Sequence, residues 1–350
     1  MRATAVQSAF GATVRQDRSV GRELAMGALP GASNSIRYGL EELKFLKSIE
    51  DLRILGAKVA YKRPRRPETL GTSPWVPPSL QIEPTNVCNL RCTTCPGARS
   101  SFPKGYMDIG LFENIISEAS RIGVKRIHLF LRGEPTLHPK IFEMIRFTKS
   151  AGLPVHLTTN GTRLTPEKCA ELLDSGVNSA DQLTISFIGH SKEGHEATMV
   201  GIDHDLVVGN ITELVRLRKE LGVNGPVIET ILNPTPETQC ETADFLRFWR
   251  GKVDHARIGE ISIAFQEYKR AGTAAVRRSS VCNYIYDRMA VAWNGQVPQC
   301  NIDIDGDSIV GDLNKDSIMD AWNSERMQTV RRIHQEGRFE ELPRCLHCDM

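Results

Sequence analysis

Nine cysteines, spaced unevenly along 350 residues, constrain this chain more than any other feature. An odd number cannot pair completely into disulfides, and several lie too close together to close structural loops. They form a trio, a C-terminal group of four and two isolated residues: Cys88, Cys92 and Cys95; Cys282, Cys300, Cys345 and Cys348; Cys169 and Cys240. Thiols clustered at two- and three-residue spacing indicate metal or iron–sulfur ligation in a reducing compartment, so we expect a cytoplasmic protein.

Charge and hydropathy exclude several other classes. The 44 Lys and Arg nearly balance the 42 Asp and Glu, which predicts no nucleic-acid partner. An apolar run of about 18 residues is missing, so we expect no membrane span. Residues 1–35 lack the apolar core of a signal peptide and are expected to be a flexible tail, with a transit peptide as the alternative. Helical spacing of apolar residues predicts a helical extension and linker over residues 36–78.

Short β-rich runs alternate with amphipathic helices across residues 79–266. The predicted strands cover residues 79–84, 125–131, 154–159, 182–187, 226–232 and 257–265. The predicted helices lie near residues 110–122, 138–151, 166–175, 204–221 and 238–250. Six strand-then-helix units predict an α/β fold with a parallel sheet, closed or partly closed, whose functional site lies at the carboxyl ends of the strands.

The alternation stops after residue 266, and residues 267–350 are expected to form a second, smaller domain. Residues 287–300 predict a β-hairpin that turns at Asn294 and Gly295. A helix is predicted from about Asp316 to Gln335.

The cysteine trio lies in the loop after the first predicted strand, where active sites of such folds collect. A four-iron cluster held by the three thiolates of Cys88, Cys92 and Cys95 keeps one iron open, as a catalytic metal site requires. The alternative is a structural zinc site that takes its fourth ligand from His128 or His138.

The C-terminal group presents four thiolates. Four thiolates saturate a four-iron cluster, so this second cluster would carry electrons or stiffen the domain. A four-cysteine zinc site is the alternative for this spacing.

The Cys-x3-Cys-x2-Cys spacing after the first strand resembles the radical S-adenosylmethionine (radical SAM) superfamily. Further residues that carry the resemblance are Arg132-Gly133-Glu134-Pro135, Thr159-Asn160-Gly161 and Ser186, which follow or end successive predicted strands. The resemblance implies a partial (β/α)6 TIM-like barrel, a [4Fe–4S] cluster on the trio and bound S-adenosylmethionine.

Four of these residues are implied to contact the cofactor: Gly133, Glu134, Asn160 and Ser186. Glu134 would accept hydrogen bonds from the cofactor ammonium, and Ser186 stands where relatives contact the ribose or carboxylate. The chain departs from the family with Arg132 in place of a glycine and Thr94 before the third cysteine. It also has Met199 or Val200 near the position of a frequent arginine, so the partner of the cofactor carboxylate is unassigned.

The C-terminal cysteines resemble the auxiliary-cluster domains of this superfamily, called SPASM in the long form and twitch in the short form. The resemblance implies a second [4Fe–4S] cluster on the four cysteines. The spacing fits the short form, as in 2-deoxy-scyllo-inosamine dehydrogenase-type and sugar or aminocyclitol epimerase-type members.

This resemblance implies an enzyme that forms a 5′-deoxyadenosyl radical and removes a C–H hydrogen from a sugar, aminocyclitol or nucleoside in natural-product (antibiotic) biosynthesis. A flavodoxin or ferredoxin would supply electrons. The outcome would be epimerisation, with Cys240 as candidate hydrogen-atom donor, or alcohol dehydrogenation, with a base among Glu267, Lys269 and Arg270. For Cys240 the alternative is an inert thiol, and Cys169 is expected to pack a helix against the sheet.

Two other functions stay open. One is a maturase that modifies a peptide or protein, and the other is a non-catalytic zinc- or iron-binding protein. The substrate and the oligomeric state are not determined by the sequence.

Overall fold

The computed structural model describes residues 75–259 and 278–348. The expected N-terminal tail, nearly all of the helical extension, and the candidate bases Glu267, Lys269 and Arg270 lie outside the described residues. In the part of the chain that is described, no helix is long and apolar enough to cross a membrane.

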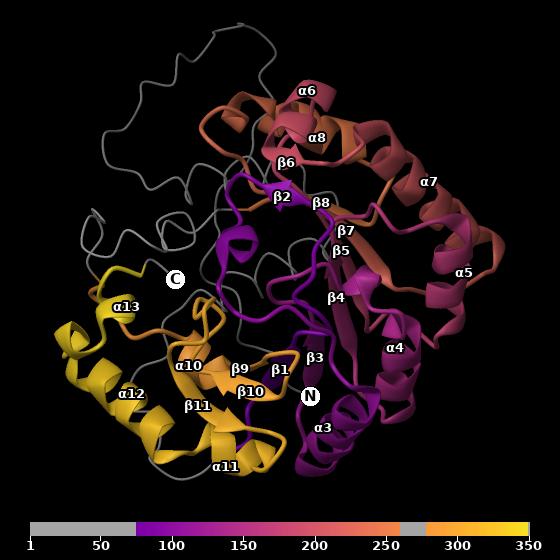
Figure 1. Cartoon of the computed structure of the whole chain (residues 1–350). Coiled ribbons are helices and arrows are strands. Elements are labelled where there is room, and N and C mark those ends of the chain that lie inside the picture. Colours follow the sequence, from indigo (N-terminus) through magenta and orange to yellow (C-terminus); the bar gives the residue numbers. More distant parts are fainter. Residues whose placement is uncertain (1–74, 260–277, 349–350) are drawn as a thin grey trace, which may run out of the picture. The chain divides into compact units, whose positions relative to one another are not determined.

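A seven-stranded parallel sheet forms the centre of the molecule, with the order β8-β7-β5-β4-β3-β1-β9 (Figure 1). Five strands of this sheet match predicted ones: β1 (Ser79–Ile82), β3 (Arg126–Leu129), β4 (Val155–Thr159), β5 (Gln182–Phe187) and β7 (Val227–Leu232). The sixth predicted strand, residues 257–265, overlaps β8 (His255–Ile258) only at residues 257 and 258, and residues 260–265 lie outside the described residues. The expectation of a partial α/β barrel is therefore confirmed.

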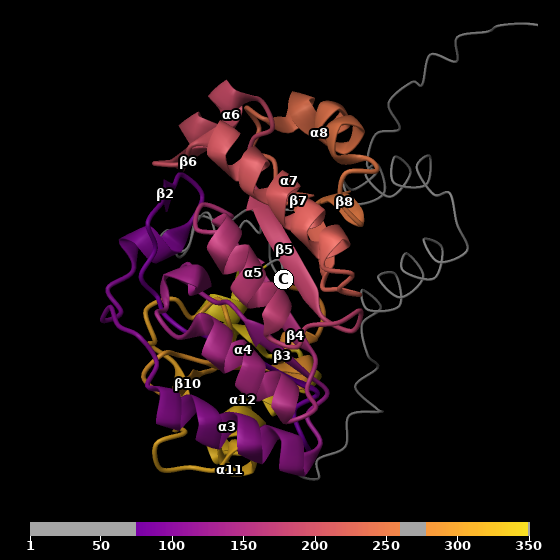
Figure 2. The same cartoon turned by 90° about the vertical axis from the view of Figure 1, so that its right-hand side faces the viewer.

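The helices between these strands cover one face of the sheet (Figure 2). They are α3 (Ile109–Ile122), α4 (Ile141–Ser150), α5 (Pro166–Asp174), α6 (Lys192–Thr198), α7 (His204–Glu220) and α8 (Thr242–Trp249). Apolar strand residues such as Leu80, Ile127 and Leu183 are fully or almost fully buried beneath them. Cys169 of α5 is fully buried, as its expected packing role requires.

Local sequence explains where these helices begin and end. The Asp108 carboxylate accepts a hydrogen bond from the Leu111 amide and so caps the first turn of α3. Gly123 ends the helix in the left-handed region, with a φ of 89°. Between them, Phe112, Ile115, Ile116 and Ala119 repeat at helical spacing and are buried, so this stripe attaches α3 to the sheet.

The C-terminal part is less separate than the sequence predicted. After the short helix α10 (Tyr284–Asp287), strand β9 (Arg288–Val291) pairs in parallel with β1 and becomes the seventh strand of the main sheet. The expected turn is present, because Gly295 has a φ of 85° and the Ala292 amide donates to the Gln296 carbonyl. Strand β10 (Gln296–Pro298), however, forms its ladder with β11 (Ile309–Asp312).

The predicted helix from Asp316 to Gln335 is two helices, α11 (Ile318–Trp322) and α12 (Glu325–Glu336). The break occurs because the Ser324 side chain accepts a hydrogen bond from the Met327 amide and starts a new helix. The chain continues through the 3-10 turn η5 (Phe339–Glu341) to α13 (Pro343–Leu346), which carries Cys345.

Candidate active site

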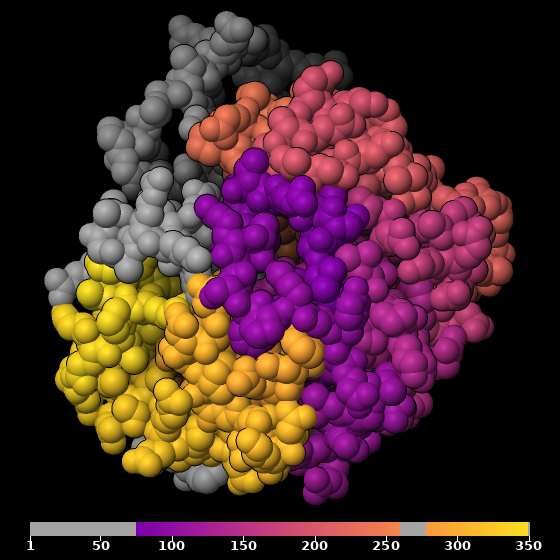
Figure 3. Space-filling model, in the orientation of Figure 1, coloured from indigo at the N-terminus to yellow at the C-terminus, as the bar shows by residue number. Residues whose placement is uncertain are grey.

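The cysteine trio lies on the segment after β1, which surrounds an opening on one face of the molecule (indigo in Figure 3). Cys92 belongs to the short strand β2 (Arg91–Cys92), which pairs with β6 (Met199–Val200). Cys88 is exposed, and Cys92 and Cys95 are half-buried. The three thiols are therefore held on one backbone segment at the carboxyl end of β1.

Without a bound metal, the thiols of Cys88 and Cys92 are protonated at pH 7. Burial and the neighbouring Cys95 and Cys88 raise the pKa of Cys92 to about 12, and burial also raises the pKa of Cys88. Thiols bind metals as thiolates, and a bound metal supplies the positive charge that deprotonates them. Lys104 opposes the rise at Cys88 and donates to the carbonyl oxygens of Asn86 and Gly97 at 3.1 Å each.

Gly133 lets the segment after β3 lie directly against the cysteine loop. A Cβ atom at this position would lie 2.3 Å from the Thr85 carbonyl oxygen and 2.7 Å from the Asn86 Cα. The next residue, Glu134, donates its amide to the Val87 carbonyl oxygen at 2.9 Å. The glycine therefore sets the approach of this segment to the residues just before Cys88.

The Glu134 carboxylate is buried and already receives protein hydrogen bonds. Its oxygens accept from the hydroxyl of Thr159 at 2.7 Å, the amide of Asn160 at 2.7 Å and the amide of Thr136 at 3.0 Å. Burial raises the pKa of Glu134, while these donors oppose the rise. In this structure the carboxylate thus organises the strand ends, and its contact with a cofactor ammonium stays a prediction.

Asn160 connects the end of β4 to the cysteine loop. Its side-chain amide donates to Asn89 Oδ1 at 3.1 Å, and Asn89 in turn donates to the Thr162 hydroxyl at 2.9 Å. Because Asn89 lies between Cys88 and Cys92, the Thr-Asn-Gly turn holds the loop in place. Ser186, late in β5, is half-buried, and its predicted cofactor contact stays untested.

The histidines proposed as a fourth zinc ligand are engaged elsewhere. His138 Nε2 lies 2.9 Å from the Met107 carbonyl oxygen, and its Nδ1 accepts from the Lys140 amide at 3.1 Å. His128 Nδ1 lies 3.1 Å from His156 Nδ1. Within residues 75–259 and 278–348, no three His, Cys, Asp or Glu side chains are arranged to hold a single metal ion.

The four C-terminal cysteines line one cavity. They come from the segment before α10, the segment after β10, and α13 with its following residues: Cys282, Cys300, Cys345 and Cys348. Burial raises the pKa of Cys345 to about 12, with Cys282 and Cys348 adding to the rise. Burial also raises the pKa of Cys282, and Arg278, which lines the cavity as well, opposes that rise. These residues suit a multi-thiolate cluster.

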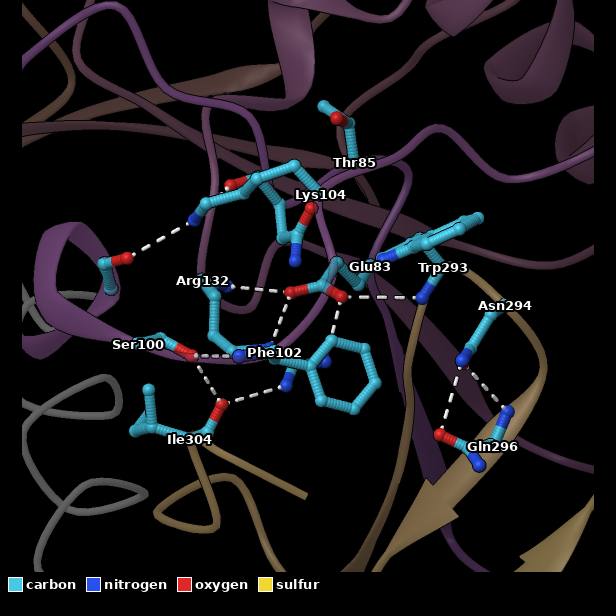
Figure 4. A network of polar contacts seen from close by, with 12 residues as sticks. Glu83, Thr85, Ser100, Phe102, Lys104, Arg132, Trp293, Asn294, Gln296 and Ile304 are labelled. Atoms are coloured by element: carbon cyan, nitrogen blue, oxygen red, sulfur yellow. Dashed lines mark hydrogen bonds and ion pairs between the residues drawn. The ribbon is translucent and has the colours of Figure 1, made fainter.

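A buried ion pair lies where the cysteine loop meets the C-terminal part (Figure 4). Arg132 contacts Glu83 with two nitrogens, Nε at 2.7 Å and NH2 at 2.8 Å, and its NH1 donates to the Ile304 carbonyl oxygen at 2.9 Å. The guanidinium also lies 4.0 Å from the centre of the Phe102 ring. The Trp293 amide donates to Glu83 at 3.2 Å, so both parts of the chain hold this pair.

Cys240 does not join the other thiols in the described residues. It is exposed in the 3-10 turn η4 (Gln239–Glu241) beyond β7, and its sulfur lies 3.9 Å from the Glu237 carbonyl oxygen. The sequence analysis did not predict that Lys104 lies near the trio, because a single lysine outside any motif is not distinguishable from other surface lysines in the sequence.

Comparison with known families identifies both parts of the chain. The model of the radical SAM superfamily matches residues 82–248, and that of the SPASM iron–sulfur cluster-binding domain matches residues 282–349. The chain therefore carries a radical SAM domain followed by a SPASM domain. The radical SAM domain implies S-adenosylmethionine and a [4Fe–4S] cluster as cofactors, and the SPASM domain implies auxiliary iron–sulfur clusters.

Curated relatives differ in what they act on. The chain is 27% identical to a tungsten-containing aldehyde ferredoxin oxidoreductase cofactor-modifying protein of Pyrococcus furiosus, over 77% of this chain and 87% of the relative. It is 40% identical to an AdoMet-dependent heme synthase of Methanosarcina barkeri, over 34% of each chain. It is 32% identical to a PqqA peptide cyclase of Rhodopseudomonas palustris, over 38% of this chain and 32% of the relative. The last two matches thus span about a third of those relatives.

Solved structures share the fold. The crystal structure of BtrN in complex with AdoMet and 2-DOIA has a TM-score of 0.56 and 18% identity, and the match covers 79% of this chain and 95% of BtrN. Streptococcus suis SuiB bound to its precursor peptide SuiA has a TM-score of 0.56 and 16% identity, with 85% of this chain and 78% of SuiB covered. At these identities the likeness establishes the fold alone.

Replacing Gly133 by alanine is expected to displace the cysteine loop. The new Cβ would overlap the Thr85 carbonyl oxygen, and such overpacking costs about 1–3 kcal/mol. We expect the iron bound at the trio to be lost, measured as iron content and visible absorption after anaerobic reconstitution. Gly209→Ala in α7 is the matched control, because nothing lies within 4 Å of its added Cβ. Full iron content in Gly133→Ala would contradict the proposed packing.

Removing Arg132 is expected to destabilise the junction between the two parts. Arg132→Met leaves the Glu83 carboxylate buried and unpaired, which costs about 3–5 kcal/mol. The unfolding temperature of the anaerobic protein should fall, and the double variant Glu83→Gln/Arg132→Met should recover part of the loss. Arg146→Met, which breaks an exposed pair with Asp174, should leave the temperature nearly unchanged. Equal unfolding temperatures for the three variants would refute this role.

Proposed function

We propose that this radical SAM enzyme dehydrogenates a carbinol carbon of a polar, hydroxyl-bearing small molecule of the sugar, aminocyclitol or nucleoside class. The observation that carries the proposal is the four-cysteine cavity, together with the buried Arg132–Glu83 pair that joins its domain to the cysteine loop. Oxidation of an alcohol to a carbonyl removes a hydrogen atom, a proton and an electron. The 5′-deoxyadenosyl radical would take the hydrogen atom, a base among Glu267, Lys269 and Arg270 is proposed to take the hydroxyl proton, and a fully ligated cluster in this cavity would accept the electron.

When bound, S-adenosylmethionine and the first cluster supply a radical that takes a hydrogen atom from an unactivated C–H bond. The role of the chain is to hold these groups and the substrate in register. We assign the first cluster to Cys88, Cys92 and Cys95, and the second cluster to the four cysteines that line the cavity. Gly133, Glu134, Asn160 and Ser186 are the proposed contacts of S-adenosylmethionine.

Dehydrogenation is preferred to epimerisation because of Cys240. Epimerisation needs a thiol that delivers a hydrogen atom inside a closed site, whereas the Cys240 thiol is exposed. Its position in the loop after β7 keeps it as the candidate donor for the epimerase alternative.

Modification of a peptide or of a large cofactor is the second candidate function. It is favoured by the similarity to a PqqA peptide cyclase and to a cofactor-modifying protein. A flavodoxin or ferredoxin is the proposed electron donor in either case.

The cluster assignment predicts about eight irons per chain after anaerobic reconstitution. Replacing Cys88, Cys92 and Cys95 together by alanine should leave about four irons, and replacing Cys345 and Cys348 should remove the other set. Cys169→Ala is the control, because its buried thiol belongs to neither set. Metal analysis that finds about four irons with one zinc would refute the second cluster.

The reaction outcome is measurable by mass spectrometry of candidate substrates incubated with reduced enzyme in D2O. We expect a product lighter by two hydrogen atoms, formed together with 5′-deoxyadenosine. A product heavier by one mass unit would instead indicate quenching by an exchangeable thiol. In that case Cys240→Ala should abolish product while 5′-deoxyadenosine is still released.

A further inference from the structure

The face of the sheet that turns away from the helices is polar. Because parallel strands in register present aligned residues to the same side, the third residue of β1, Gln81, shares its face with His128 of β3, and His128 shares it with His156 of β4. The same face continues across β5, β7 and β8 with Thr184, Glu229 and Arg257. We call this surface the inner face.

Most of these groups are paired with one another. His156 Nε2 lies 2.9 Å from the Thr184 hydroxyl, which donates to Glu229 Oε1 at 3.2 Å. The same Glu229 oxygen lies 2.9 Å from Arg257 Nε. Glu229 is thus the charged partner of Arg257, and the hydrogen bonds between them and His156 span three neighbouring strands.

Two further arginines of the inner face lack such a partner. Arg126 and Arg288 are the first residues of β3 and β9, and both align with Ser79 of the intervening strand β1. The Arg126 side chain makes no hydrogen bond or ion pair with a described residue, although its backbone belongs to the β1–β3 ladder. Arg288 NH1 donates to the Tyr284 hydroxyl at 3.1 Å, but its buried Nε has no partner in the structure. The inner-face strand residues therefore carry three arginines against one glutamate.

The neighbouring arginines add to the effect of burial on the pKa values of His156 and His128. Burial, and after it the charges of Arg126, Arg288 and Arg257, lower the pKa of His156 to about 3. The pKa of His128 is lowered by the same kind of burial and by Arg288 and Arg126. Both imidazoles are neutral at pH 7 and cannot offset the guanidinium charges, but they remain available as hydrogen-bonding groups.

We propose that Arg126 and Arg288 bind an anionic group of the substrate, a carboxylate or a phosphate, at the amino-terminal ends of β3 and β9. Guanidinium groups bind such anions with two parallel hydrogen bonds, which suits both classes of anion. This inference rests on the proposed function and narrows its substrate to an acidic or phosphorylated sugar, nucleoside or related molecule.

The position of the site also constrains substrate length. Strand β3 runs from Arg126 to Leu129, which spans about 10 Å, and the cysteine loop lies at the carboxyl ends of the strands, beyond Leu129. The anionic group must therefore be remote from the reacting carbon. Tyr284, which contacts Arg288, also donates its hydroxyl to Gln81 and lines the four-cysteine cavity. The anion site thus adjoins the proposed electron acceptor.

Titration calorimetry of the reconstituted full chain with S-adenosylmethionine tests the site, with inorganic phosphate and malonate as separate probes. We expect one equivalent of at least one probe to bind, and Arg126→Gln or Arg288→Gln to weaken its affinity about tenfold each. Arg126→Lys keeps the charge but loses the paired hydrogen bonds, so its affinity should lie between those of the wild type and Arg126→Gln. Arg121→Gln, which removes an exposed charge from the helix side, is the matched control and should change nothing.

A second measurement needs no variant. Phenylglyoxal modifies accessible arginines, and mass spectrometry of peptides shows which ones. Phosphate or malonate should slow modification of Arg126 and Arg288 and leave Arg121 unaffected. No saturable binding of either probe, equal affinity in all variants, or equal modification with and without the probe would each overturn the inference.

The release of 5′-deoxyadenosine from reduced enzyme without substrate separates this inference from the proposed function. Wild type and the arginine variants should release it alike, because neither arginine lies at the cysteine loop. If release fails while anion binding is lost on substitution, the proposed function is wrong and the anion site stands. If release occurs without anion binding, only the anion site is wrong.

Discussion

The buried ion pair between Glu83 and Arg132 is the interaction on which the arrangement of the two cluster sites depends. Burying two charges is costly, and only close geometry with further hydrogen bonds offsets the cost. Here the offset comes from two contacts between the side chains, the Ile304 carbonyl oxygen and the Trp293 amide. Because these groups come from both ends of the described chain, the pair is satisfied only when the SPASM domain is in place.

Arg132 therefore has a structural role between the two domains that the sequence motif did not indicate. In the motif it appeared as a departure from a glycine, next to the residues implied to bind the cofactor. The structure shows that its backbone stays with the cysteine loop while its side chain turns toward Ile304. The Arg132 side chain thus connects the two domains through its hydrogen bond to Ile304. Gly133 provides the close approach of the backbone to Thr85 and Asn86.

The sequence predicted the features whose signal is local. Strand and helix periodicity located the first five strand-and-helix units, and cysteine spacing separated the two groups of thiols. It did not predict that Arg288–Val291 would pair with β1, because strand pairing over more than 200 residues depends on which edge is left open. It also did not predict the break before Ser324, since an apolar stripe can continue across a capped junction.

The polar inner face could have been predicted from the polar residues within the predicted strands, which a search for motifs does not consider. Parallel strands covered on both sides are usually apolar throughout, yet here the polar side chains of Gln81, His128 and Glu229 are buried within the strands. Such residues persist only if something polar fills the space they face. Part of that requirement is met by the pairing of Glu229 with Arg257 and Thr184. The remaining charge, at Arg126 and Arg288, is what makes this face selective for a particular ligand, whereas the cysteine loop at the opposite strand ends serves the chemistry common to the family.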